Sequence, residues 1–402
     1  MEPKGQHNSK PSDLSYKPLK YLSIERPPPS LPTRRTANYP PSLWDDFYIQ
    51  SLQNNSLDEA QVDLWEKLKE EIKQLIGKQE NMKGQLEFID ALSQLGVSYH
   101  FQGEIKNVLG FITSSYDSLK DKLSNNLYVT TLLFRLLRER DLETSHLSLG
   151  DLLQSFKSGY ESSELAIKED VKCILGLYEA CFLAVGGENE ADEAIENLTE
   201  RLLKFREKQL SASLCEQIDH ALELPLHWRI PRLHTKWFID AYEKQDNMNP
   251  KLLQFAKLDF NLLQSIYKKE LKEISRWWKN LGLTSFEISF ARDRLVELYL
   301  WVVACSYEPQ FWRCRMNITK CGTLLTIIDD VYDVYGSLDE LQLFTAAIIE
   351  WNINAIHHLP NYMKIILRAL FNTINDVANT VLIEKGLEIL PRLKKGMLPP
   401  MA

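Results

Sequence analysis

The sequence has little glycine and little proline: 16 glycines and 17 prolines in 402 residues, with much of the proline near the two ends. Because these residues interrupt helices, their scarcity leaves room for long helices between the ends. No apolar run is long enough to cross a bilayer, and no secretory signal opens the chain, so no membrane span is expected. A net charge of −8 without any block of lysine or arginine argues against nucleic acid as a partner.

Cysteine is also scarce, and no pair of cysteines has the C-x-x-C spacing. This excludes a zinc motif or disulfide framework and predicts buried thiols in a reducing, intracellular compartment. The six are Cys173, Cys181, Cys215, Cys305, Cys314 and Cys321. The first residues carry Glu2, Asp13 and Glu25 among lysines and serines, whereas an organelle transit peptide is poor in acids. We therefore expect at best a weak transit peptide.

What the sequence does contain is helical periodicity. Residues 1–43 are polar and rich in proline, which predicts an extended strap. Beyond residue 56, apolar residues recur at three- and four-residue steps, and no segment alternates as a strand does. Two prolines within LELPLHWRIPRL, residues 222–233, indicate a domain junction. The chain is thus predicted to be all-α, with one domain at 44–228 and a second at 232–395.

The segment LLTIIDDVYDVYG, residues 324–336, is the most informative motif. On a helix Asp329 and Asp333 share a face, while Asp330 points roughly 100° away. Two carboxylates one turn apart repel each other unless a cation lies between them, and Mg²⁺ takes oxygen ligands of this kind. The alternative interpretation is a solvated acidic turn that ends the helix before Gly336.

A second motif, FARDRLVELYLW, precedes the acidic one. Arg292 and Arg294 are suited to phosphate because guanidinium donors match its oxygens in pairs. Trp301 follows on the same predicted helix. Taken singly, these residues also fit a mixed-charge helix surface and an ordinary core aromatic. Together with the aspartates they describe a pocket that holds a diphosphate at its mouth and a hydrocarbon below.

The ordered set of motifs resembles the plant terpene synthases, in particular the monoterpene synthase-like subfamily. Arg34 and Arg35 followed by Trp44 fit RRx8W, and SRWWKNLGL, FARDR, YEPQF and DDVYD follow in the family's order. The resemblance implies two α-helical domains: an N-terminal relict barrel without its own chemistry, and a C-terminal helical bundle with the active site. No DxDD motif occurs, so protonation-initiated cyclisation is not expected.

The resemblance also implies roles for the acidic motif and for the substrate. Asp329 and Asp333 would bind Mg²⁺ or Mn²⁺, with Asp330 as a supporting ligand. RRx8W points to geranyl diphosphate, and farnesyl diphosphate stays open. Gly322, just before the aspartates, leaves room in the pocket and argues against an isoprene-sized substrate. The family favours a plastid location, whereas the weak leader leaves the cytosol open.

Further roles follow from the resemblance for the aromatic and basic residues. Arg292 and Arg294 would stabilise charge on the departing diphosphate, and the face of Trp301 would stabilise the carbocation. The strap with Arg34 and Arg35 would close over the pocket. A monomer is the expectation.

One departure from the family concerns the end of the chain. The second metal motif, N/D-D-x-x-S/T-x-x-x-E, does not follow DDVYD, and residues 396–402 diverge from the family pattern. Asp339 and Glu340 are interpreted as surface acids after Gly336. We therefore expect an incomplete bundle whose exposed apolar faces favour aggregation or a partner. Two hypotheses stay open: a terpene synthase that acts on a prenyl diphosphate, and a catalytically inactive truncated paralogue.

Overall fold

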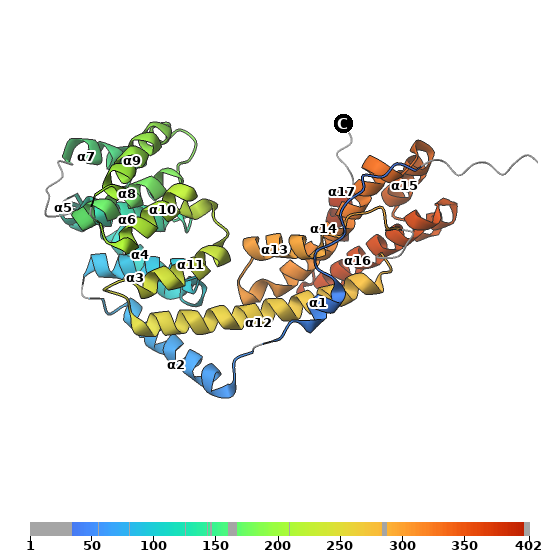
Figure 1. Cartoon of the computed structure of the whole chain (residues 1–402), viewed down its shortest axis with the longest axis horizontal. Helices are drawn as coiled ribbons and strands as arrows, with labels where there is room; N and C mark the ends of the chain where they lie inside the picture. Colours follow the sequence, from blue (N-terminus) through green and yellow to red (C-terminus); the bar gives the residue numbers. More distant parts are fainter. Residues whose placement is uncertain are drawn as a thin grey trace, which may run out of the picture.

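The computed structural model describes residues 34–397, apart from 55, 80, 125, 143, 145–146, 160–166, 209 and 284–287. The expectations for residues 1–33 and 398–402 lie outside the described residues. The described part of the chain is helical and contains no strand, which confirms the all-α prediction. Figure 1 shows two bodies of helices connected by one long helix that runs beneath both.

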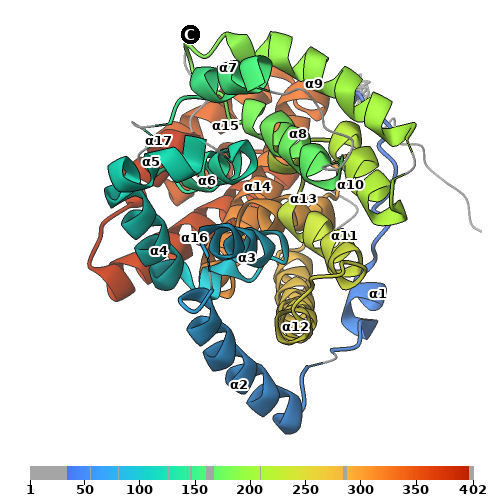
Figure 2. The same ribbon diagram turned by 90° about the vertical axis from the view of Figure 1, so that its left-hand side faces the viewer.

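The N-terminal body, within the described ranges, consists of ten α-helices. They are α2 (Glu59–Ile76), α3 (Met82–Gln94), α4 (Gln102–Ser114), α5 (Tyr116–Ser124), α6 (Leu127–Arg138), α7 (Leu149–Gly159), α8 (Ile167–Cys181), α9 (Glu190–Arg206), α10 (Ala212–Glu223) and α11 (Pro231–Glu243). A single apolar core runs through this body, with Phe101, Phe134 and Leu177 among its fully buried side chains. Figure 2 looks onto this body.

The C-terminal body follows the long helix α12 (Pro250–Asn280). It consists of α13 (Leu295–Cys305), α14 (Trp312–Asp330), the π-helical turn η5 (Val331–Tyr335), α15 (Leu338–Glu350), α16 (Asn361–Lys385) and α17 (Leu390–Met397). Its core lies between α14, α15 and α16, where Leu324, Phe344 and Ile366 are fully buried.

The two cores meet along α12. Leu252 and Phe255 of this helix belong to the core of the N-terminal body, whereas Ile274 and Trp278 belong to the other core. The boundary between the two hydrophobic cores therefore lies within α12. This is later in the sequence than the junction that the prolines of residues 222–233 suggest. The physical reason is that Pro231 occupies the first turn of α11, where a missing N–H costs nothing and a helix begins rather than a domain.

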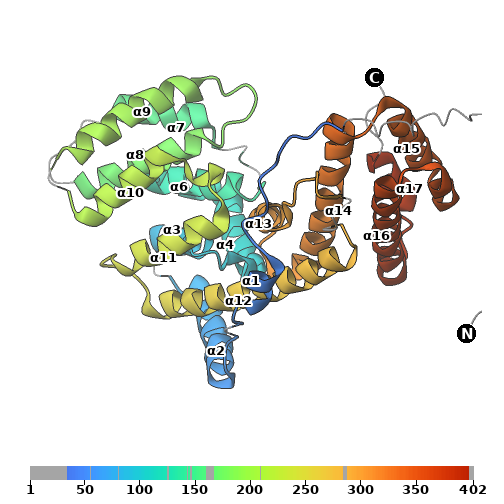
Figure 3. The same cartoon turned by 45° about the vertical axis from the view of Figure 1, so that its right-hand side comes forward.

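The described part of the strap, residues 34–43, lies along the C-terminal body (Figure 3). It ends in the short helix α1 (Asp46–Ser51), which packs on α12. The Asp46 carboxylate accepts a hydrogen bond from the Ser275 hydroxyl at 2.9 Å and pairs with Lys279 at 3.0 Å. The N-terminal segment is thus attached to the half of α12 that supports the acidic motif.

Two expectations about surfaces have mixed outcomes. All six cysteines are free thiols: Cys173 and Cys181 are buried, Cys215 and Cys321 are half-buried, and Cys305 and Cys314 are exposed at the facing ends of α13 and α14. The prediction of buried thiols is therefore wrong for the two exposed cysteines. Large apolar side chains are exposed on the C-terminal body, as expected: Leu300, Trp301, Ile318, Leu343, Ile349, Leu382, Ile383 and Leu387. None of the helices in the described ranges combines the length and the apolar character that a membrane crossing requires.

Candidate functional site

The acidic motif lies where α14 changes into a π-helical turn. Asp330 is the last residue of α14, and Gly336 closes η5 by donating its N–H to the Val331 carbonyl at 2.8 Å. A Cβ on Gly336 would lie 2.7 Å from a Leu341 methyl carbon and 2.9 Å from the Val331 oxygen, so only glycine fits here. Single π-turns in helices are frequent at functional sites because they redirect side chains.

The three aspartates of the motif divide into two exposed and one buried. Asp329 and Asp333 are exposed, and partial burial, together with the nearby Asp333 charge, raises the pKa of Asp329 above its usual range. Asp330 is 0% exposed and turns into the protein. The different direction of Asp330 agrees with its angular offset on the helix.

Asp330 is bound by Arg292. One carboxylate oxygen accepts the backbone N–H of Arg292 at 2.7 Å, and the other pairs with the Arg292 guanidinium at 2.7 Å. The carboxylate raises the pKa of Arg292 further, so the arginine stays charged. In this arrangement Asp330 fixes the arginine motif beside Asp329 and has its own charge neutralised.

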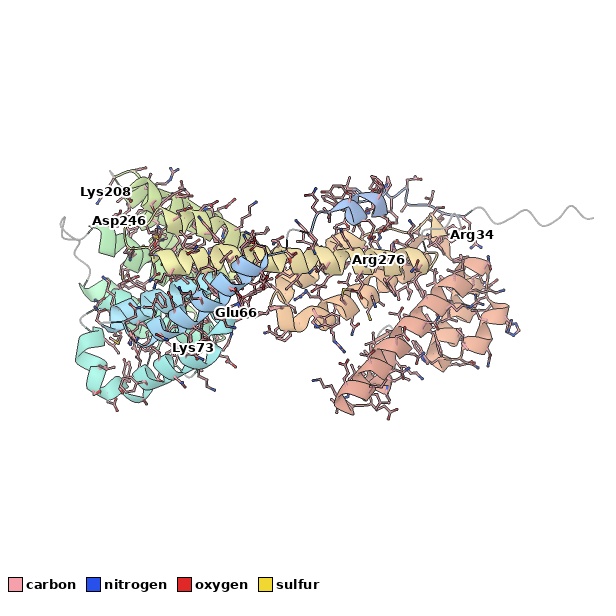
Figure 4. All side chains as sticks on the ribbon, turned by 90° about the horizontal axis from the view of Figure 1, so that it is seen from below. Arg34, Glu66, Lys73, Lys208, Asp246 and Arg276 are labelled. Atoms are coloured by element: carbon pink, nitrogen blue, oxygen red, sulfur yellow. The ribbon has the colours of Figure 1, made fainter. Side chains whose placement is uncertain are left out.

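The strap contributes two contacts beside the motif. Tyr39 lies under the Arg292 guanidinium, 4.9 Å from the ring centroid. Arg34 donates to both oxygens of Glu340, at 2.5 and 2.6 Å, and to the carbonyl of Tyr335 at 3.2 Å. Figure 4 labels Arg34 at the end of the described strap, next to the C-terminal body. The strap is therefore held at both ends of η5.

Glu340 is more than a surface acid, and the interpretation from sequence is wrong on this point. Besides Arg34, it accepts the Tyr362 hydroxyl at 3.0 Å and the Ser337 N–H at 3.1 Å. The hydrogen bonds from Arg34, and then those from Ser337 and Tyr362, lower the pKa of Glu340 to about 2. The rings of Tyr335 and Tyr362 flank the Arg34 guanidinium at 5.0 and 5.4 Å. Glu340, Tyr335 and Tyr362 form an arginine-binding box that sequence reasoning missed.

The remaining predicted site residues have looser environments. Arg35 is exposed, and no hydrogen bond or ion pair of its side chain lies within the described residues. Arg294 stands at the N-cap of α13 and donates to the Asp293 carbonyl at 2.7 Å. Trp301 is 67% exposed, so its ring is open to solvent rather than enclosed. The structure brings together Asp329, Asp330 and Arg292, but it does not enclose Trp301 with them.

A buried ion pair sets the position of α14, and it was not foreseen from sequence. Arg315 on α14 is 0% exposed and donates to both oxygens of Glu270 on α12, at 2.6 and 2.8 Å. The same guanidinium donates to the carbonyls of Ser306 and Glu308 at 2.6 and 2.7 Å. A helix fixed in this way can present its C-terminal aspartates in a constant place.

The donor set fits a hard divalent cation in part. Within the described ranges no group of three His, Cys, Asp or Glu side chains is placed to hold a metal ion. Asp329 and Asp333 offer two adjacent carboxylates that repel each other. Mg²⁺ commonly binds through one or two carboxylates and completes its coordination shell with water and substrate phosphates. Two protein carboxylates are therefore enough to bind one such ion together with a phosphate-containing substrate.

Comparison with family models gives two matches. Residues 43–222 match the model described as "Terpene synthase, N-terminal domain", and residues 279–399 match "Terpene synthase family, metal binding domain".

Relatives and solved structures agree with these matches. The (−)-α-terpineol synthase of Vitis vinifera is 45% identical over 90% of this chain and 61% of its own length. Monoterpene synthase 8, chloroplastic, of Hedychium coronarium is 43% identical over 96% of this chain and 69% of its own. The crystal structure of limonene synthase with 2-fluorolinalyl diphosphate has a TM-score of 0.80 at 38% identity, covering 90% of this chain and 66% of that one. The chain spans about three fifths of the length of several relatives that it matches.

Proposed function

The chain belongs to the terpene synthase family, and we propose that it ionises an acyclic prenyl diphosphate with release of diphosphate. Geranyl diphosphate is the proposed substrate and a monoterpene the proposed product, with farnesyl diphosphate as the longer alternative. The relatives named for terpineol, myrcene and thujene synthesis support this choice. The observation that carries the proposal is the exposed pair Asp329 and Asp333 next to Arg292.

The proposed roles at the site follow from charge. Asp329 and Asp333 would hold Mg²⁺, or Mn²⁺, on the face of η5 that is open to solvent. The ion supplies positive charge that neutralises the diphosphate as it leaves. Arg292, whose side chain is 31% exposed, adds positive charge beside the same oxygens. Asp330 is a positioning residue, because it acts through Arg292.

Arg294, Trp301 and the strap have supporting roles in this proposal. Arg294 adds positive charge near the diphosphate. Trp301 offers an aromatic face to the carbocation through cation–π attraction. Arg34 in its box keeps the strap beside the motif, where Tyr39 covers Arg292 and limits the access of water. Arg35 adds a second positive charge on the strap.

The test is a product assay on the purified chain with Mg²⁺, in which dimethylallyl, geranyl and farnesyl diphosphate are offered in turn and volatiles are separated by gas chromatography. The expected result is a monoterpene from geranyl diphosphate that is lost in Asp329→Ala. Asp339→Ala is the matched control, because Asp339 is an exposed acid just beyond the motif. No product from a folded, monodisperse chain would instead support the catalytically inactive paralogue.

A location in the plastid is proposed on a separate ground. Several relatives carry the word chloroplastic in their names, including the myrcene synthase of Quercus ilex and the isoprene synthase of Populus alba. A fusion of the whole chain to a fluorescent protein distinguishes the plastid from the cytosol.

A further inference from the structure

The N-terminal body contains a cavity that the proposed reaction does not use. Its volume is about 480 Å³, within the range of small-molecule sites. Five helices form a closed ring around it, since α3 contacts α6, α6 contacts α8, α8 contacts α10, α10 contacts α11, and α11 returns to α3. These helices lie together in the body that faces the viewer in Figure 2.

A chain of hydrogen bonds ends at this cavity with a fixed polarity. Gln94 donates its amide N–H to the Asp90 carboxylate at 2.8 Å, so its oxygen faces His234 as an acceptor. His234 must therefore donate from Nε2, at 3.2 Å, and accept at Nδ1 from Nε2 of His220, also at 3.2 Å. The Nδ1 of His220 is left as a lone-pair acceptor, and no hydrogen bond to it lies within the described residues.

Both imidazoles are neutral. Burial, followed by the nearby positive charge of Arg229, lowers the pKa of His220 to about 4, and burial with its positively charged neighbours lowers that of His234 to about 3. The His220 ring stacks on Trp237 with centroids 3.4 Å apart, which fixes the ring that carries the lone pair. His220, which lines the cavity, thus carries an acceptor nitrogen and no positive charge.

Glu179 is the second acceptor in the wall. One of its oxygens accepts the Leu226 N–H at 2.8 Å, and in the described part of the chain no cationic side chain forms an ion pair with it. Burial raises the pKa of this carboxyl to about 7, although the Leu226 N–H and the nearby charges of Arg135 and Arg229 act to lower it. A bound cation would lower this pKa again, because an opposite charge favours the ionised form of the carboxyl.

The cationic side chains of the wall already have protein partners. Lys172 pairs with Glu87 at 3.2 Å, and Lys244 pairs with Glu216 at 2.8 Å. Arg135 binds Asp90 and also Glu139, the latter at 2.6 Å. An anionic ligand would therefore compete with existing ion pairs for each of these described cations. A cationic ligand with several N–H donors can instead bind the Glu179 carboxylate and the acceptor nitrogen of His220.

We infer that this cavity binds a small organic ammonium ion, with Glu179 as the counter-ion and His220 Nδ1 as the second acceptor. The ligand is a primary amine in its protonated form, held by charge-assisted hydrogen bonds in a site ringed by five helices. Each such bond to an ionised carboxylate is strong enough to dominate the affinity of a small ligand.

The experiment is isothermal titration calorimetry of the full chain at pH 8 with putrescine, and with butane-1,4-diol as the neutral molecule of the same length. We expect putrescine to bind, and Glu179→Gln to weaken it by roughly ten- to a hundredfold. His220→Phe keeps the stacking on Trp237 and should weaken binding by about tenfold. Glu200→Gln, a surface acid on α9, is the matched control and should bind as the unaltered chain does.

The variants are checked by circular dichroism, so a loss of fold is not mistaken for a loss of binding. The amide oxygen introduced by Glu179→Gln can still accept the Leu226 N–H, which keeps the local structure. Equal affinity of the unaltered chain and Glu179→Gln would overturn the inference. Equal binding of putrescine and butane-1,4-diol, or no heat with either, would overturn it as well.

Discussion

Arg292 and Asp330 bind each other through two contacts, one from the backbone N–H and one from the guanidinium of the arginine, both at 2.7 Å. The carboxylate is 0% exposed, whereas the arginine side chain is 31% exposed. The middle aspartate of the acidic motif is thus committed to the arginine motif. This relationship joins the end of α14 to the loop before α13. It predicts that removing the arginine alone costs more stability than removing both charges together.

Removal of Arg292 should cost more stability than an ordinary surface substitution. Arg292→Met leaves the Asp330 carboxylate buried without its guanidinium, which costs about 3 kcal/mol in the free energy of unfolding. The double variant Arg292→Met, Asp330→Asn should recover much of this loss, because no unpaired charge remains. Urea unfolding of the unaltered chain, both single variants and the double variant measures the effect. Strict additivity of the two substitutions would show that the pair is not coupled.

Arg34 and Glu340 should be coupled across the strap. A double-mutant cycle with Arg34→Ala and Glu340→Gln is expected to give a coupling of about 1–2 kcal/mol, since the pair is bidentate but partly open to solvent. Arg35→Ala serves as the control on the same strap. A coupling of zero, or an equal loss in Arg35→Ala, would contradict the arginine-binding box.

Stability should also depend on the ionisation of Glu340. Its pKa is lowered from 4.5 to about 2, so its contribution is fully present above pH 4.5 and is lost as the pH falls toward 2. The difference in unfolding free energy between the unaltered chain and Glu340→Gln should therefore shrink over this interval. A difference that stays constant with pH would mean that the carboxylate charge does not stabilise the box.

Glu179 should have the opposite pH dependence. Its pKa is raised from 4.5 to about 7, so folding is penalised at high pH, and the penalty disappears as the pH falls from 7 to 4.5. The size is on the order of 3 kcal/mol. His220 and His234 titrate in the opposite sense, so the quantity to follow is the difference between the unaltered chain and Glu179→Gln. No change of this difference between pH 5 and pH 8 would contradict the assignment.

The exposed apolar side chains of the C-terminal body should promote association. Ile383 is 84% exposed on α16, and Leu387 beyond the helix is 59% exposed. Ile383→Glu with Leu387→Glu should shift sedimentation toward the monomer expected from the sequence. Val185→Glu, at a 57% exposed site of the N-terminal body, is the control. Monomers at all concentrations in the unaltered chain would contradict the expected association.

Helical periodicity was sufficient to predict much of this molecule. It predicted the all-α class, and it separated Asp330 from Asp329 and Asp333 because residues one apart on a helix point in different directions. The site roles rest on residue chemistry together with family resemblance and stay predictions. They concern Asp329, Asp333, Arg292, Arg294, Trp301, Arg34 and Arg35. The 67% exposure of Trp301 is the clearest difference from the pocket that was expected.

The missed features depend on contacts between distant parts of the chain. Glu340 binds Arg34, which lies 306 positions away in the sequence. Ser337 and Glu340 also form the capping box that begins α15, so the sequence pattern indicates only a helix start. Likewise, Glu270 and Arg315 lie on different helices, and each alone is an unremarkable charge in a helical segment. The cavity of the N-terminal body exists only after five helices close into a ring, so no local pattern reveals it.

The most direct test of the central claim is the release of diphosphate from geranyl diphosphate with and without Mg²⁺, measured for the unaltered chain, Asp329→Ala and Asp339→Ala. We predict Mg²⁺-dependent release in the unaltered chain and in Asp339→Ala, and loss of at least about a hundredfold in Asp329→Ala, since a metal-binding carboxylate supplies several kcal/mol at the transition state. Unchanged release by Asp329→Ala would contradict the account of the site.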